Sequence, residues 1–147
     1  MCLYLHHRCR RLYSHLEYGV LQQSNARPID YRIRNALTYI HQHASLNPRM
    51  DDVARRVGLS RSRFFEQFRH CVGISPQHYL DWARVRLATN WLSTTDLPLT
   101  ELSDQLGFDN QSNFTRFFTQ HMGVSPSEFR RQTTTVVDTS EPLQSRP

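Results

Sequence analysis

The chain has 147 residues, of which 21% are charged and 11% aromatic, and none of its apolar runs approaches the about 18–20 residues that span a membrane. This composition predicts one water-soluble globular domain, or two very small ones sharing a core, and excludes a membrane protein. The net charge of +5 is carried by 18 arginines without a lysine, which favours an anionic partner. Arginine-only usage is equally compatible with a bias in genome composition.

The first 27 residues share no motif with the rest and stay unassigned: an extension, a linker from an upstream domain, or a mis-chosen start. They show no secretory signal, and the three cysteines of the chain include no C-x-x-C pair. We therefore expect a reducing location inside the cell. The metal-ligand residue types in this segment are Cys2, His6, His7 and Cys9. Their spacing matches no recognised zinc site, so we expect no metal and no cofactor.

Helical patterns begin with a helix over about residues 30–44, which places Ile33, Leu37 and Ile40 on one side. Residues 50–73 then predict a first helix-turn-helix. Its first helix has apolar residues at i, i+3, i+4 and i+7, namely Met50, Val53, Ala54 and Val57. Gly58 suits a turn with positive φ, and Ser60 suits the N-cap of the next helix. The inward stripe of that second helix consists of Phe64, Phe68 and Cys71.

A linker helix is predicted over about residues 76–94. Ser75 supplies its N-cap and Pro76 its first turn, where no amide donor is needed. Its apolar side is expected on one face, formed by Tyr79, Ala83, Leu87 and Trp91. At 1.5 Å per residue this helix extends roughly 27 Å. That length is close to the ~34 Å between successive major-groove openings on one side of B-DNA.

The first helix-turn-helix pattern recurs over residues 98–122. The stretch "GISPQHYL" returns as "GVSPSEFR", and Phe64 and Phe68 return fifty positions later as Phe114 and Phe118. Apolar positions, glycines and Ser-Pro pairs recur together, which indicates a structural repeat. The sequence therefore predicts an all-α fold of about seven helices, with two helix-turn-helix subdomains joined by a long linker helix. This domain covers residues 28–132, and a disordered tail is expected over 133–147.

The stretch "ELSDQLGFDNQSNFTRFFTQHMGVSPSEFR", from Glu101 to Arg130, resembles the DNA-binding domain of the AraC/XylS family of bacterial transcription regulators. It contains Gly-Phe, a polar stretch, Phe-x-Arg-x-x-Phe and Gly-x-Ser-Pro in the order of the family signature. Weaker agreement extends from about Asp30. The resemblance implies sequence-specific binding of double-stranded promoter DNA through two recognition helices in adjacent major grooves. It also implies control of transcription, commonly activation through contact with RNA polymerase, and a cytoplasmic location in a bacterium, associated with the nucleoid.

Carried over residue by residue, the resemblance assigns six DNA-contacting positions to each recognition helix. Those of the second unit are Asn110, Gln111, Ser112, Asn113, Thr115 and Arg116. Those of the first unit are Arg61, Ser62, Arg63, Phe65, Glu66 and Arg69. Asn and Gln can pair with adenine and Arg with guanine, so their chemistry agrees independently. Glu66 departs from the family, which usually has a basic residue there, and Phe65 suits either a thymine methyl or the edge of the core.

A regulator fragment or helical protein-interaction module without autonomous DNA binding is the alternative function. Glu66 favours it, as does the net charge of −2 over residues 96–132, from three arginines and five acidic residues. An enzyme is not expected, because adjacent residues such as His70 and Cys71 point apart on a helix and cannot form a dyad. No segment is long enough for a small-molecule-binding domain, so we expect the chain to act alone or to be a fragment. The target promoter, direction of control, inducing signal and oligomeric state stay open.

Overall fold

The computed structural model describes residues 30–137 of the chain. Seven α-helices and one 3-10 helix, without a strand, make up this part. They are α2 (Tyr31–Gln42), η2 (Ala44–Leu46), α3 (Met50–Arg56), α4 (Arg61–Val72), α5 (Pro76–Thr94), α6 (Leu99–Gln105), α7 (Gln111–Met122) and α8 (Pro126–Val137). The prediction of an all-α fold with two helix-turn-helix units is confirmed. None of the helices in this range is long and apolar enough to cross a membrane.

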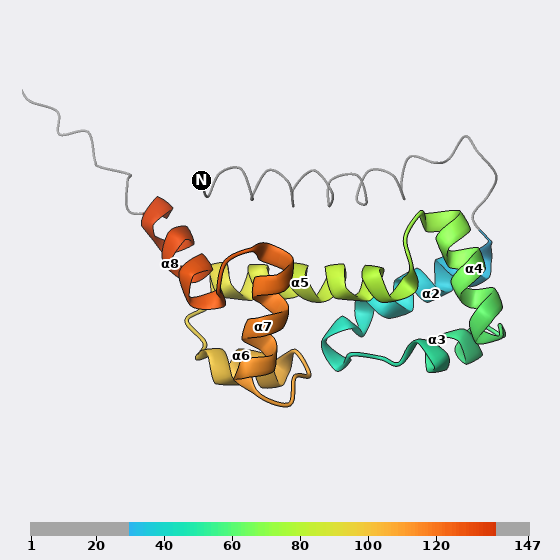
Figure 1. Cartoon of the computed structure of the whole chain (residues 1–147), viewed down its shortest axis with the longest axis horizontal. Coiled ribbons are helices and arrows are strands. Elements are labelled where there is room, and N and C mark those ends of the chain that lie inside the picture. Colours follow the sequence, from blue (N-terminus) through green and yellow to red (C-terminus); the bar gives the residue numbers. More distant parts are fainter. Residues whose placement is uncertain (1–29, 138–147) are drawn as a thin grey trace, which may run out of the picture.

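Helix α5 is the axis on which both units are built (Figure 1). Helices α2, α3 and α4 lie around its amino-terminal half, and α6, α7 and α8 around its carboxyl-terminal half. Two hydrophobic clusters result. Tyr79, Leu80 and Ala83 of α5 belong to the first cluster, while Ala88 and Leu92 belong to the second.

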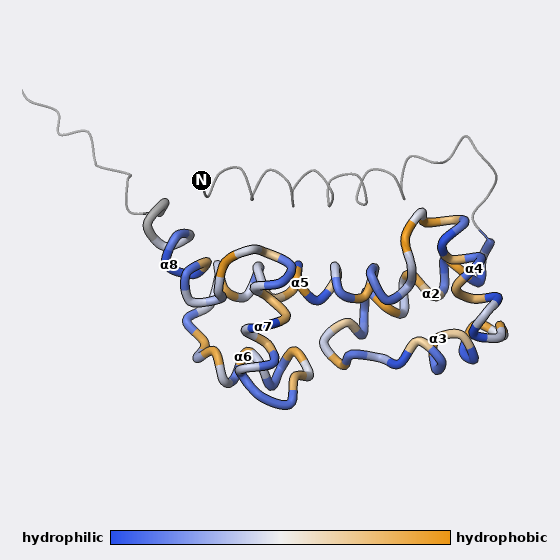
Figure 2. The backbone as a smooth tube through the Cα atoms, in the orientation of Figure 1, coloured by the Kyte–Doolittle hydropathy of each residue, from blue (hydrophilic) through white to orange (hydrophobic). Residues whose placement is uncertain are grey.

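The glycines and caps form as the sequence predicts. Gly58 and Gly107 both have a φ of +71°, a conformation that favours glycine. The Ser60 hydroxyl accepts a hydrogen bond from the amide of Arg63 at 3.4 Å, and Ser75 caps α5 through the amide of His78 at 3.2 Å. In Figure 2, hydrophobic and hydrophilic residues alternate along α4 and α7, which is the pattern of helices with one buried side.

Two sequence-based expectations need correction. Helix α5 does not bury a single face, because it lies between the two units and contacts both. Leu87 and Trp91 are only half-buried, whereas Arg84 and Val85 are buried on other sides. The tail is also not irregular from residue 133, since α8 continues to Val137. Residues 138–147 and the unassigned 1–27 segment lie outside the described residues.

Phenylalanines at matching positions fill the centre of each cluster, and their truncation tests the two cores. Phe68 and Phe118 are both fully buried, so Phe68→Ala and Phe118→Ala should each lower the free energy of unfolding by about 3–5 kcal/mol. Leu46 is 72% exposed, and Leu46→Ala should stay within about 0.5 kcal/mol of the parent. Urea denaturation followed by circular dichroism measures all three. A small loss for either phenylalanine would contradict the packing described.

Candidate nucleic-acid interface

The two predicted recognition helices, α4 and α7, are oriented alike. They run in the same sense, and their amino-terminal ends lie at the same edge of the molecule, the lower one in Figure 1. Each follows a short helix and a glycine turn, α3 with Gly58 and α6 with Gly107. Both helix tips therefore lie on one side of the molecule, from which they can contact the same partner.

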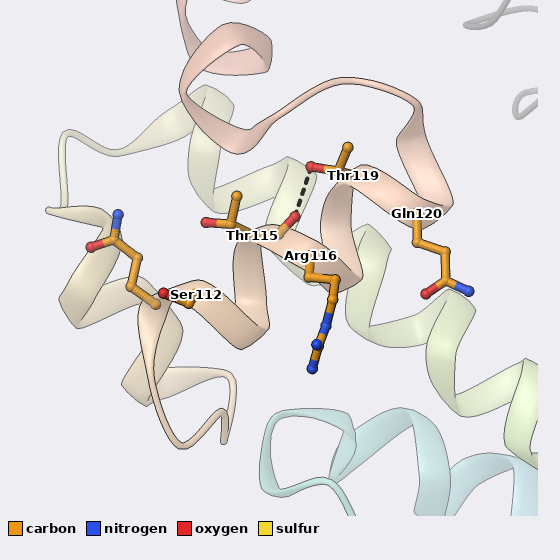
Figure 3. A pocket seen from close by; sticks show the side chains of 6 residues that line it. Ser112, Thr115, Arg116, Thr119 and Gln120 are labelled. Atoms are coloured by element: carbon orange, nitrogen blue, oxygen red, sulfur yellow. Dashed lines mark hydrogen bonds between the residues drawn. The ribbon is translucent and has the colours of Figure 1, made fainter.

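The start of α7 has a connected set of polar side chains. The Asn110 side-chain oxygen caps the helix by accepting from the amide of Asn113 at 2.9 Å. The Arg116 guanidinium donates to the side-chain oxygen of Asn113 at 3.2 Å. Arg116 is exposed and extends away from the helix axis (Figure 3). Gln111 and Ser112 are exposed as well, while Asn113 and Thr115 are half-buried.

A shallow depression, open to solvent, lies along α7. It is lined by Gln111, Ser112, Thr115, Arg116, Thr119 and Gln120 (Figure 3). A second open depression along α4 is lined by Phe65, Glu66, Arg69 and His70. These four residues precede Thr115, Arg116, Thr119 and Gln120 by fifty positions each. Both recognition helices thus have an open depression at corresponding positions, lined by side chains of different chemistry.

The start of α4 is organised around Arg61. Its guanidinium forms an ion pair with Asp51 of α3 and lies 4.8 Å from the centre of the Phe65 ring. The hydrogen bond from Arg61 is the main cause that lowers the pKa of the Asp51 carboxyl. Phe65 itself is half-buried and packs against the first core cluster, 6.0 Å from Phe64 between ring centres. Its position therefore agrees with the edge-of-core interpretation.

The remaining predicted contact residues of α4 lie on its solvent side. Ser62, Arg63, Glu66 and Arg69 are all exposed. Glu66 occupies the position equivalent to Arg116, so the two helices present opposite charges at corresponding sites. Asp51, which holds the side chain of Arg61, was not among the predicted residues. The sequence indicated only that Asp51 lies in the first turn of α3, and not that it pairs with Arg61.

Sequence reasoning also missed Arg84, which is 5% exposed in the middle of α5. One of its terminal nitrogens donates to the carbonyl oxygen of Leu106 at 2.7 Å. The guanidinium carbon lies 4.0 Å from the centre of the Phe108 ring and 5.2 Å from that of Phe117. Burial lowers the pKa of Arg84, and the charge of Asp81 opposes that effect. Arginine in a helix is usually solvent-exposed, so periodicity could not have identified this contact.

Two further arginines of the second unit lie in α8. Arg130 donates to the carbonyl oxygen of Leu97 at 2.7 Å, and Arg131 lies 3.6 Å from the carboxylate of Glu128. Arg130 thus holds α8 against the segment before α6. Over residues 30–137, side chains of His, Cys, Asp and Glu do not gather in threes as a metal site would require. Cys2, His6, His7 and Cys9 lie outside that range.

Comparison with known proteins agrees with this architecture. A family model described as a helix-turn-helix domain, of AraC type, matches residues 53–132. The arabinose operon regulatory protein of Salmonella typhimurium is 39% identical over 113 residues, which are 76% of this chain and 40% of that protein. The chain thus spans less than half the length of this relative.

Solved structures share the fold. The C-terminal domain of AraT, a response regulator from Geobacillus stearothermophilus, is 27% identical with a TM-score of 0.68, over 82% of this chain and 95% of that one. The DNA-binding domain of AdpA, a global transcriptional factor crystallised with a target DNA, has a TM-score of 0.68 at 23% identity. That likeness covers 74% of this chain and 97% of the AdpA domain.

The N-cap of α4 holds the amino-terminal end of the first recognition helix. Ser60→Ala removes the hydroxyl that accepts from Arg63 and should lower the free energy of unfolding by about 1 kcal/mol. Ser60→Asp should keep most of the parent's free energy of unfolding, because a carboxylate caps equally well. Ser62→Ala, two residues into the helix, is the matched control and should change stability by less than about 0.5 kcal/mol. Urea titration distinguishes the three, and equal values for Ser60→Ala and Ser62→Ala would contradict the capping role.

Proposed function

The chain belongs to the AraC/XylS family of helix-turn-helix transcription regulators, and we propose that it recognises promoter DNA by inserting α4 and α7 into adjacent major grooves. One observation carries the proposal: the amino-terminal ends of both helices lie at one edge of the molecule, in the same sense. In helix-turn-helix proteins this end of the second helix approaches the base edges. An arrangement with the two tips on opposite sides could not engage one duplex.

The second unit has the chemistry for reading bases. Arg116 can donate two hydrogen bonds to guanine, and Asn113 or Gln111 can pair with adenine. The 3.2 Å hydrogen bond between Arg116 and Asn113 holds the two side chains together before DNA binds. Less side-chain freedom then has to be lost on binding. Asn110, Ser112 and Thr115 complete the proposed contact set.

The first unit has the chemistry for holding the DNA backbone. Arg61 and Arg63 in the first turn of α4 and Arg69 in its last turn are exposed cations, and arginine binds phosphate through two hydrogen bonds. Glu66 repels phosphate but can accept from the amino group of cytosine. Residues 28–95 carry ten arginines and five acidic residues, a net charge of +5. Most of the electrostatic attraction to DNA therefore comes from the first unit, with Ser62 and Phe65 as secondary contacts.

We further propose that the chain activates transcription through contact with RNA polymerase, and that it does so in the cytoplasm, where its DNA partner lies. The relative from Salmonella typhimurium is a regulatory protein of the arabinose operon, which supports control of transcription here. A helical interaction module without its own DNA site is the second candidate. The net charge of −2 over residues 96–132 and the acid at position 66 favour it.

Selection of bound duplexes from random DNA, at stated salt, decides between the two candidates. A regulator should enrich one site of two adjacent blocks, each protected in a hydroxyl-radical footprint, and its affinity should fall steeply with salt. An interaction module should enrich no sequence. Recovery of no preferred site would overturn the proposed function.

Arg116 and Arg69 should differ in what their loss does to recognition. Arg116→Ala should weaken binding to the selected site by about 1–3 kcal/mol and relax the preference at one base pair. Arg69→Ala should weaken binding to all sequences alike and reduce the salt slope by about 1. Fluorescence anisotropy against the selected duplex and its single-base variants measures both effects. A uniform loss on all duplexes for Arg116→Ala would exclude a base-reading role.

Asp51 should compete with phosphate for Arg61, because its carboxylate holds that guanidinium in the free protein. Asp51→Asn removes the charge and keeps an acceptor, so it should strengthen DNA binding and steepen the salt slope by about 0.9, the value of one further phosphate contact. Asp52→Asn is the matched control, since Asp52 pairs with Arg55 on α3. Equal effects of the two variants would show that general charge, and not the Asp51–Arg61 pair, is responsible.

A further inference from the structure

The two units touch directly at the glycine turn of the second one. A β-carbon added at Gly107 would lie 2.7 Å from the carbonyl oxygen of Ser45, with atoms of Leu46 and Asn47 at 3.7 Å. Ser45 belongs to η2, which precedes the first helix-turn-helix. Since real β-carbons essentially never approach a backbone atom this closely, the backbones meet here only because residue 107 is glycine.

The equivalent glycine of the first unit has no such neighbour. Gly58 has the same φ of +71°, yet a β-carbon there would meet nothing within 4 Å. The left-handed turn therefore accounts for a glycine at both positions, and the close approach concerns Gly107 alone. Comparing Gly58→Ala with Gly107→Ala therefore separates the effect of straining the turn from the effect of disturbing the contact with η2.

Arg84 contacts the same turn. Its guanidinium donates to Leu106 and lies over the ring of Phe108, the residues on either side of Gly107. Arg84 projects from the middle of α5, while η2 also packs against α5. The three residues 106–108 thus contact both a side chain of the linker helix and the backbone of the first unit.

Building on the proposed DNA-binding function, we propose that Gly107 and Arg84 are positioning residues that fix the orientation of α7 relative to α4, so that the chain reads two half-sites at one set spacing. Neither residue touches DNA in this proposal. Both act through the turn that precedes α7. The contact between the turn and η2 joins the units at a second point besides α5, and two points of attachment restrict rotation of one unit about the linker helix.

The spacing of half-sites is sensitive to this orientation. One inserted base pair moves a half-site by about 3.4 Å along the duplex and rotates it by roughly 34–36°. A rigid pair of helices cannot follow both changes, whereas a loosened pair can. The proposal therefore predicts a strict spacer preference in the parent protein and a weaker one when the junction is disturbed.

The first experiment measures the orientation without DNA. Spin labels are placed on the full chain at Arg55→Cys in α3 and Asp104→Cys in α6, both exposed, after Cys2→Ser, Cys9→Ser and Cys71→Ala. Pulsed electron resonance should give one narrow distance distribution for the parent and for Gly58→Ala. Gly107→Ala and Arg84→Met should shift or broaden it. A distribution for both that matches the parent would overturn the proposal.

The second experiment uses the duplex selected from random DNA by the parent chain, with the spacer between its two protected blocks lengthened or shortened by one base pair. The parent and Gly58→Ala should lose about tenfold or more in affinity on each altered spacer. Gly107→Ala and Arg84→Met should lose severalfold less. A loss of affinity on the altered spacers as large as that of Gly58→Ala would contradict the positioning role.

The two experiments keep the proposals apart. A chain that selects no DNA site overturns the proposed function, while the spin-label distances still decide whether the junction is rigid. Circular dichroism first establishes that each variant is helical. Should Gly107→Ala not fold, Arg84→Met decides alone, because methionine keeps an unbranched apolar side chain in α5 and removes only the guanidinium contacts. An unchanged distribution and spacer profile for Arg84→Met would then refute the proposal.

Discussion

The structure depends on the sharing of one helix between two cores. Each helix-turn-helix unit is too small to bury enough apolar surface alone, and α5 supplies the missing side chains to both. Tyr79, Leu80 and Ala83 complete the first cluster, and Ala88 and Leu92 the second. Because one rigid element belongs to both cores, the distance between the units is set by the rise of that helix. The shared helix thus joins the two helix-turn-helix units into one domain with two separate recognition helices.

Local order in both units follows from residues whose roles are visible in the sequence. Ser60, Ser75 and the paired phenylalanines could be assigned before the structure because caps and helical stripes depend only on spacing along the chain. Their repetition fifty residues later strengthened each assignment. The matching φ of +71° at Gly58 and Gly107 shows that the same turn is used twice. Where the repeat holds, sequence and structure agree closely.

The parts that could not be predicted are those that depend on contacts between the repeats. Arginine is usually a surface residue, yet Arg84 is buried because it contacts Leu106 and Phe108. Gly107 lies close to the backbone of η2, which is remote in sequence, whereas Gly58 has no such neighbour. The several buried sides of α5 have the same origin. A periodic pattern reports one face at a time, and only the folded chain shows which faces meet a second unit.

The two recognition helices have the same local structure but different exposed side chains. They also differ in the partners that hold their arginines. Arg61 is bound by an acid outside its own helix and lies over Phe65, an arrangement that, in the proposed function, suits a backbone contact more than the reading of a base. Arg116 is held by Asn113, itself a base-reading type, on an exposed surface with an open depression beside it. A carboxylate cannot replace this guanidinium at a guanine. Glu66 therefore makes the units unequal, and an unequal pair suits an asymmetric site on which one chain has only one orientation.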